Sequence, residues 1–264
     1  MTPSPPYTPP EKEAWTGGSS VPDSVTFFSF RWTAAVFLCA FLCASFLAAV
    51  WGKREEGKLL GSFLSGCVFF LPVIAAGIFS RLYAWKKVPD LSGKTVFPFW
   101  NVSPGKKTFF LAGGAILGGV LLQAPVLLLG LLQQGLFRKL ALPLPPQEKV
   151  TQIMNVLESA DPVPGLLLVL LPTVLFAPLA EELFFRLILF ETLRKVWKEN
   201  GAIWASVFLF AVLHGSVSAF LPLILVGFVC QKVFLKSRSL LASVLLHFSF
   251  NLTSFLLLLW KCRS

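Results

Sequence analysis

Runs of about twenty apolar residues dominate the chain and limit its possible folds more than any other feature. A helix needs ~20 apolar residues to cross the ~30 Å hydrocarbon core of a bilayer. Such runs, bounded by charged residues, Pro or Gly, cover roughly residues 32–51, 59–79, 109–132, 165–189, 202–219, 221–235 and 240–260. Residues 202–235 could also be two short helices broken near Leu221-Pro222. We therefore expect an all-α, polytopic membrane protein with about seven (six to eight) transmembrane helices.

Composition supports the bilayer as the solvent of this chain. Of its 264 residues, 55% are hydrophobic and 14% are charged, and the mean hydropathy is +0.74. These values lie outside the usual balance of a water-soluble domain. The net charge of +10 could suggest nucleic acid. However, the basic residues form short clusters between apolar runs rather than a basic stripe with interleaved aromatics, so we expect a lipid bilayer and no nucleic acid as partner.

The distribution of basic residues predicts an orientation in the membrane. With seven spans, Lys and Arg are more numerous on the side that holds the N-terminus. The largest cluster there consists of Arg81, Lys86, Lys87, Lys94, Lys106 and Lys107. The positive-inside rule then predicts a cytoplasmic N-terminus. In a bacterial cell, this multi-pass protein would lie in the plasma (inner) membrane.

The chain divides into four segments by composition. Residues 1–26 are rich in Pro and Ser and predict a disordered tail. Residues 27–140 hold the N-terminal transmembrane helices, and residues 141–164 form a loop or an interfacial helix around Lys149–Ser159. Residues 165–260 hold the remaining spans. The third span carries small residues that favour close helix packing, namely Gly113, Gly114, Gly118 and Gly119.

Three charged residues interrupt the fourth apolar run, where they need an explanation. Glu181, Glu182 and Arg186 are surrounded by Leu, Phe and Ala. A charge in hydrocarbon costs several kcal/mol, so such residues indicate a functional site. At ~100° per helical residue, Arg186 lies ~40° from Glu182 but ~140° from Glu181. We therefore expect Glu182 and Arg186 to pair, and Glu181 to face elsewhere.

The chain has two histidines, and both fall within later apolar runs. His214 follows Phe210 by one helical turn, which places an aromatic ring next to the imidazole. His247 and Asn251 are likewise one turn apart. Together with Ser243 and Ser254, they form a polar stripe on a helix otherwise made of Leu, Phe and Val. Such a stripe must face protein or water rather than lipid.

These polar groups suit the hydrolysis of a peptide bond. Glu181 and the imidazole of His214 could hold and deprotonate a water molecule. An imidazole N–H of His247 and the amide of Asn251 could stabilise the negative charge that develops on the carbonyl oxygen. The same residue types could instead bind zinc or another divalent ion. The sequence has no H-E-x-x-H motif, and the ligands would come from separate helices, so spacing alone leaves both chemistries open.

In combination, these motifs resemble those of the CPBP family (CAAX protease and bacteriocin-processing, or Abi). They occur in the family's order as Glu181-Glu182-x-x-x-Arg186, Phe210-x-x-x-His214 and His247-x-x-x-Asn251, within residues 165–258. The resemblance implies an all-helical, four-helix-type catalytic core over residues 165–260. It also implies a conical cavity that opens to one membrane face and laterally to lipid, and an intramembrane endopeptidase related to the eukaryotic CAAX prenyl endopeptidase.

The resemblance also implies a role for each motif residue. It makes Glu181, with His214, the base that activates water, and it makes His247 and Asn251 the oxyanion stabilisers. The supporting residues are Glu182, Arg186 and Phe210. The family is often labelled metalloprotease, so zinc or another divalent metal is an alternative to the cofactor-free mechanism that the resemblance favours. The implied substrate is a membrane-tethered peptide or protein.

Two other classes of function are compatible with the same sequence. A noncatalytic membrane scaffold or immunity protein would keep the fold and act by binding a partner. A proton- or ion-coupled transporter also uses intramembrane carboxylates and histidines. The transporter hypothesis leaves the ordered motifs unexplained.

Overall fold

Every element in the described part of the chain is a helix, as the apolar runs predict. The computed structural model describes residues 23–51, 58–87, 106–145, 151, 154–156 and 162–263. The N-terminal helices are α1 (Asp23–Trp51), α2 (Lys58–Lys87), α4 (Lys106–Leu121) and α5 (Gln123–Lys139). The C-terminal helices are α7 (Pro162–Leu170), α8 (Ala177–Glu182), α9 (Glu191–Val196), α10 (Glu199–Leu213), α11 (Phe220–Ser237) and α12 (Leu240–Arg263). Shorter elements are the π-helical segments η2 (Leu171–Phe176) and η3 (Leu183–Phe190) and the 3-10 turn η4 (Val217–Ala219).

Six helices in the described residues are long and apolar enough to cross a membrane, which confirms a polytopic membrane protein. They cover Ser29–Leu47, Phe63–Ser80, Phe109–Lys139, Pro164–Val196, Val217–Ser237 and Leu240–Lys261. Their outer surfaces carry large apolar side chains, such as Phe46, Phe109 and Trp260, which are 68%, 77% and 70% exposed. Lipid, rather than water, is the solvent that suits such surfaces.

The predicted span over residues 202–219 is wrong in its extent. The corresponding helix is α10, which has 15 residues and ends at Leu213. At ~1.5 Å per residue it is ~22 Å long, less than the hydrocarbon core. The chain then turns and returns as α11, so the break lies at His214–Ser216 and not near Leu221-Pro222. Pro222 falls in the first turn of α11, where a missing N–H costs nothing.

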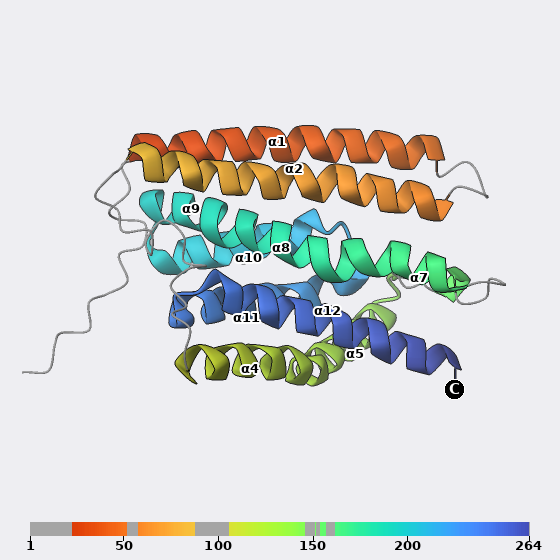
Figure 1. Ribbon diagram of the computed structural model, residues 1–264. Helices are drawn as coiled ribbons and strands as arrows, with labels where there is room; N and C mark the ends of the chain where they lie inside the picture. Colours follow the sequence, from red (N-terminus) through yellow and green to blue (C-terminus); the bar gives the residue numbers. More distant parts are fainter. Residues whose placement is uncertain are drawn as a thin grey trace, which may run out of the picture.

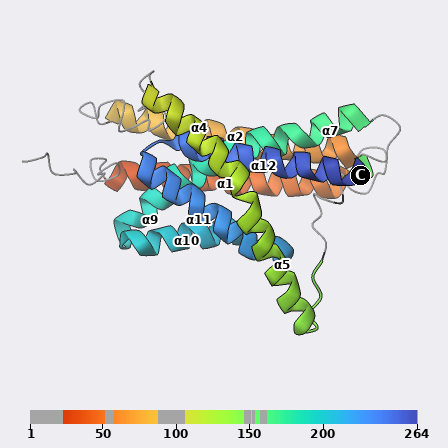
Figure 2. The same cartoon turned by 90° about the horizontal axis from the view of Figure 1, so that it is seen from below.

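The third predicted span is longer than expected and bends. Residues 109–132 were expected to form one span, whereas the structure has α4 and α5 joined at Leu122. Pro125 cannot donate to the carbonyl of Leu121, which removes one helical hydrogen bond at the bend. The neighbouring bonds from Leu122 N to Gly118 O and from Val126 N to Leu122 O persist, at 2.9 and 3.2 Å. In Figure 2, α5 is angled away from the other helices.

The helices pack in an order that places the fourth span in the middle. Helices α1 and α2 lie side by side along one edge, with the run α7–α9 next to them (Figure 1). Helix α10 packs against α11, and α12 packs against both α4 and α8. The run α7–α9, α10, α11 and α12 together make up the predicted four-helix core. A hydroxyl contact of 2.9 Å between Thr33 Oγ1 and Ser80 Oγ joins α1 to α2.

Parts of the predicted domain organisation lie outside the described residues. Helix α1 begins at Asp23, within the predicted tail of residues 1–26, and the rest of that tail is not described. Of the predicted interfacial helix around Lys149–Ser159, Thr151 and residues 154–156 are described and helical. The domain boundaries and the cytoplasmic N-terminus therefore stay predictions.

Two of the four glycines of the third span lie against another helix. A Cβ at Gly119 would collide with the Ser249 side chain and with the backbone of Leu246 and Phe250 in α12. Gly118 approaches Leu246 as well, whereas Gly113 and Gly114 have no described residue within 4 Å of such a Cβ. The close approach of α4 and α12 thus depends on Gly119.

We expect Gly119→Ala to destabilise the protein by ~1–3 kcal/mol, because the added methyl group must push the backbone of α12 away. Gly113→Ala in the same helix is the matched control, because open space surrounds that position. Thermal unfolding in detergent measures both variants. Equal unfolding temperatures for the two variants would contradict the close contact at Gly119.

Candidate active site

The two adjacent glutamates end the short helix α8, between the π-helical segments η2 and η3. Wide π-helical turns inside longer helices occur frequently at functional sites. Consecutive helical residues point ~100° apart, so Glu181 and Glu182 face different neighbours. The two carboxylates consequently have different environments, although they are adjacent in sequence.

Glu182 is fully buried and forms the predicted ion pair with Arg186, whose side chain is also fully buried. Arg186 Nε donates to Glu182 Oε2 at 2.9 Å, and Arg186 Nη2 donates to Glu182 Oε1 at 3.4 Å. A buried charge needs a partner and hydrogen bonds to offset its lost hydration. The two opposite charges satisfy that need within one helical run.

Two further helices form hydrogen bonds with this ion pair. From α12, the Ser243 hydroxyl donates to Glu182 Oε2, and His247 Nδ1 lies 3.0 Å from Glu182 Oε1. A carboxylate can only accept, so His247 donates through Nδ1. From α11, Gln231 Oε1 accepts from Arg186 Nη1 at 3.4 Å. The ion pair thereby connects the fourth span to α11 and α12.

Glu181 lacks comparable partners and faces both histidines. Its Oε2 is buried and has no hydrogen-bond partner within the described part of the chain. This oxygen lies 3.8 Å from His214 Nε2 and 3.7 Å from His247 Nε2. Both distances exceed the range of a direct hydrogen bond. The structure therefore brings Glu181, His214 and His247 to one point.

The His214 imidazole is oriented by the end of its own helix. His214 Nδ1 lies 2.7 Å from the carbonyl oxygen of Phe210. Because a carbonyl only accepts, Nδ1 carries the hydrogen and Nε2 is left as the acceptor of a neutral ring. Gly215 follows with φ of +63°, a backbone conformation that favours glycine and turns the chain away. Nε2 is thus fixed toward Glu181.

The Phe210 ring packs against both histidines and against Arg186. Its buried ring lies 4.5 Å from the His214 ring and 6.0 Å from the His247 ring, between centroids. The guanidinium carbon of Arg186 is 5.5 Å from the centre of the same ring. Gly227 of α11 makes room for it, since a Cβ there would come within 3.0 Å of Phe210 Cδ1.

Asn251 forms its hydrogen bond with the backbone of the π-helical segment η2 rather than with the other site residues. Its Nδ2 donates to the carbonyl oxygen of Thr173 at 2.9 Å. In η2 the Ala177 N–H bonds to Pro172 O, and Pro178 has no N–H to offer Thr173. The Thr173 carbonyl therefore has no helical partner, and Asn251 satisfies it. One amide hydrogen of Asn251 is thus committed, and the second is available for another acceptor.

Sequence reasoning missed several buried or half-buried amides that connect the helices in and around the site. Gln231 contacts Arg186, and Gln123 Nε2 donates to Phe250 O and Ser254 Oγ at 2.6 and 2.9 Å. Gln133 is also buried, with 2% of its surface exposed. Each is an uncharged polar residue within an apolar run, which is the signal that could have identified them.

One group of metal-capable side chains in the described residues lies close enough to share an ion, namely Glu182, Cys230 and His247. This group does not fit a cation. Both Glu182 oxygens already accept hydrogen bonds, and the Arg186 guanidinium occupies the adjacent position with a positive charge. The donor set around Glu181 is different, because one carboxylate and two imidazoles are ligand types that zinc accepts.

Comparison with known proteins agrees with the motifs. Residues 163–253 match the family model described as type II CAAX prenyl endopeptidase Rce1-like. No curated protein and no solved structure matches the chain. The matched segment contains all three motifs, so the part of the chain that holds the candidate site is similar to the CAAX-type membrane protease family that the motifs resemble.

We expect Glu182→Gln to destabilise the protein far more than Glu181→Gln, although the two residues are adjacent and identical in type. Removing one partner of a buried ion pair costs ~3–5 kcal/mol, because Arg186 would remain buried without a counter-charge. Within the described part of the chain, Glu181 Oε2 has no hydrogen bond to lose. Thermal unfolding in detergent compares the variants.

Adding Arg186→Met to Glu182→Gln should recover part of the lost stability, since no charge is then left unpaired. Similar destabilisation by the two glutamate variants would contradict the different environments of these carboxylates.

Proposed function

We propose that this protein is an intramembrane endopeptidase that hydrolyses a peptide bond of a membrane-tethered protein or peptide. The observation that carries the proposal is the position of Glu181 Oε2, which is buried without a donor among the described residues and lies 3.7–3.8 Å from two imidazole nitrogens. A water molecule bound there would gain the polar partners that a buried water requires. The match of residues 163–253 to a CAAX endopeptidase family supports the same class of reaction.

Glu181 is the base of the proposed reaction, and His214 holds the water. With Nδ1 donating to Phe210 O, His214 Nε2 accepts one hydrogen of the water, and Glu181 accepts the other. As the water oxygen attacks the scissile carbonyl carbon, its proton moves to Glu181. Glu181 then gives this proton to the leaving nitrogen when the C–N bond breaks, so the carboxylate is regenerated.

His247 and Asn251 stabilise the oxyanion in the proposed mechanism. His247 donates through Nδ1 to Glu182, so it can donate through Nε2 only as an imidazolium. The positive charge of this imidazolium offsets the negative charge of Glu181. The charges of Glu182 and Arg186 already offset each other, so the cluster as a whole is neutral. The second amide hydrogen of Asn251 provides another donor one helical turn away. Donors fixed before the reaction stabilise the developing charge without reorganisation.

Glu182, Arg186 and Phe210 are supporting residues in this mechanism. Glu182 orients the His247 ring, Arg186 neutralises Glu182, and the Phe210 ring underlies both imidazoles. We propose that the reaction needs no cofactor. A zinc or other divalent ion held by Glu181, His214 and His247 is the alternative, in which the ion would activate the water.

The substrate reaches the site from the bilayer in this proposal. The scissile bond must come to Glu181 among helices whose outer faces are apolar, so a segment already tethered to the membrane is favoured over a soluble protein. The proposed orientation places the N-terminus in the cytoplasm, and in a bacterium the protein would lie in the plasma membrane.

We expect Glu181→Gln to lower the cleavage rate by ~100- to 10,000-fold, the range for loss of a general base, while the protein stays folded. The assay uses purified protein in lipid vesicles with a panel of membrane-tethered peptides, including one with a prenylated C-terminus. Glu199→Gln, at the exposed start of α10, is the control and should cleave like the wild type. Wild-type cleavage should persist in a strong chelator.

Each alternative gives a different result in this assay. Loss of cleavage in chelator, restored by added zinc, would establish the metal-dependent mechanism. Undiminished cleavage by folded Glu181→Gln would remove Glu181 from the reaction. A wild-type protein that cleaves no peptide of the panel, but binds one of them, would favour the noncatalytic scaffold.

A further inference from the structure

Gln133 is a buried amide that the reaction described above does not use. It lies in α5, outside the segment that matches the family, and only 2% of its surface is exposed. The next residue, Gln134, has the same side chain but is exposed. A buried polar side chain in a membrane helix is costly unless its hydrogen bonds are made.

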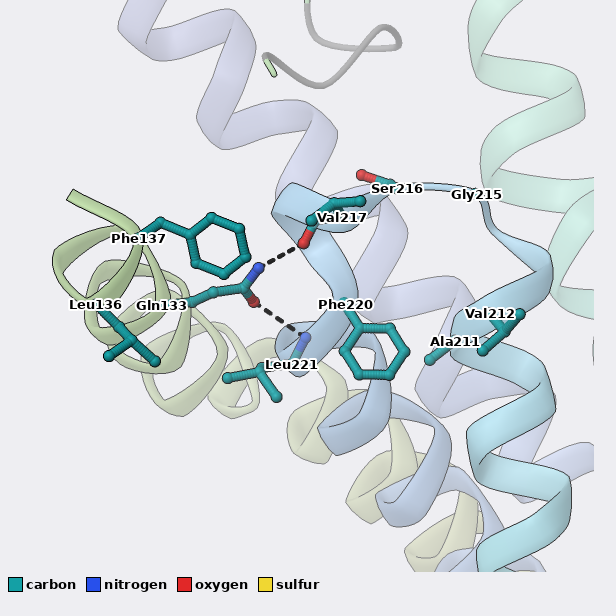
Figure 3. Close-up of a pocket in the computed structure, with 10 residues that line it drawn as sticks. All are labelled: Gln133, Leu136, Phe137, Ala211, Val212, Gly215, Ser216, Val217, Phe220 and Leu221. Carbon is teal, nitrogen blue, oxygen red and sulfur yellow. Dashed lines mark hydrogen bonds between the residues drawn. The ribbon is translucent and has the colours of Figure 1, made fainter. Parts of the chain in front are cut away.

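Both ends of the Gln133 amide bond to the turn between α10 and α11 (Figure 3). Its Nε2 donates to the carbonyl oxygen of Val217, and its Oε1 accepts from the backbone N–H of Leu221 at 3.0 Å. Leu221 is in the first turn of α11, where backbone N–H groups have no partner within the helix. Gln133 thus acts as an external cap for this helix.

The surroundings of the turn make these two bonds important. A pocket of about 480 Å³ lies between α5 and the turn, lined by apolar side chains such as Leu136, Val212 and Phe220 (Figure 3). Close packing is therefore incomplete on that side. The Val217 carbonyl also accepts from the Phe220 N–H, so the Leu221 N–H is the backbone group that would lose its hydrogen bond without Gln133. A buried donor without a partner is costly.

The same turn carries His214. Val217 follows His214 by three residues, and Gly215 lies between them. Glycine has no side chain beyond hydrogen, so the backbone at this position can rotate more freely than at other residues. His214 is the residue directly after α10, and its Nδ1 is held by the Phe210 carbonyl. A shift of the turn would therefore move the imidazole relative to Glu181.

We propose that Gln133 is a positioning residue that holds His214 in its catalytic orientation by fixing the backbone at Val217 and Leu221. The inference rests on the proposed function for its effect on catalysis. It also gives the N-terminal helices a part in the active site, because Gln133 of α5 supplies the hydrogen bonds to Val217 and Leu221. Gln133 itself does not touch the reacting atoms.

Histidine NMR tests this proposal directly, because the chain has only two histidines. In protein with 15N-labelled histidine, Gln133→Leu should shift or broaden the ring signals of His214 and leave those of His247 unchanged. The variant His214→Ala assigns the signals. Gln134→Leu is the matched control and should change neither ring. Gln133→Asn, which keeps an amide but is too short to reach the turn, should repeat the effect with less disturbance of packing.

The activity assay separates this proposal from the proposed function. Gln133→Leu should lower kcat by ~10- to 100-fold with KM nearly unchanged, since misplacing a catalytic group by ~1 Å can cost ~100-fold. Unchanged His214 signals in both Gln133 variants, or equal changes at His214 and His247, would overturn the positioning role. A selective change at His214 without any loss of activity would keep that role and remove His214 from the reaction.

Discussion

The fully buried ion pair between Glu182 and Arg186 is the interaction on which the rest of the site depends. It places two opposite charges in the middle of an apolar bundle, where neither could remain alone. Ser243 and His247 from α12 and Gln231 from α11 complete its hydrogen bonds. Three parts of the core are thereby fixed relative to one another by directional contacts rather than by apolar packing alone.

This arrangement separates two tasks between adjacent carboxylates. Glu182 is committed to structure, because its oxygens accept from Arg186, Ser243 and His247. Glu181 is the base in the proposed mechanism, and its Oε2 has no donor in the described residues and faces two imidazoles. Glu182 also orients His247, one of the two histidines that face Glu181. Loss of Glu182 would consequently disturb both the fold and the position of His247.

Much of this organisation follows from the sequence, because helical periodicity and the cost of buried charge are local constraints. The pairing of Glu182 with Arg186 and the contact of Phe210 with His214 are both i,i+4 relations, and the structure confirms both. The extent of α10 was mispredicted, because the apolar run was extended through Gly215-Ser216, although a glycine is a helix-stop signal and Gly215 has φ of +63°. A run of apolar residues does not reveal where a helix stops.

Contacts between distant helices could not be predicted from spacing. The bond of Asn251 to Thr173 depends on the π-helical turn before Pro178, and the bond of Gln133 to Val217 joins residues 84 positions apart. Similarly, only Gly119 of the predicted glycine cluster would collide with α12, because its position in α4 faces the Leu246 and Phe250 backbone. These features depend on tertiary packing, which a single sequence does not encode in its periodicity.

An experimental structure at a resolution that shows ordered water would test the role of Glu181 most directly. The predicted result is a water molecule within ~3 Å of both Glu181 Oε2 and His214 Nε2, with no anomalous scattering from a metal at that position. A metal ion bound by Glu181 and the two histidines at ~2.0–2.2 Å would contradict it. A Glu181 carboxylate turned away from His214 and paired elsewhere would contradict it as well.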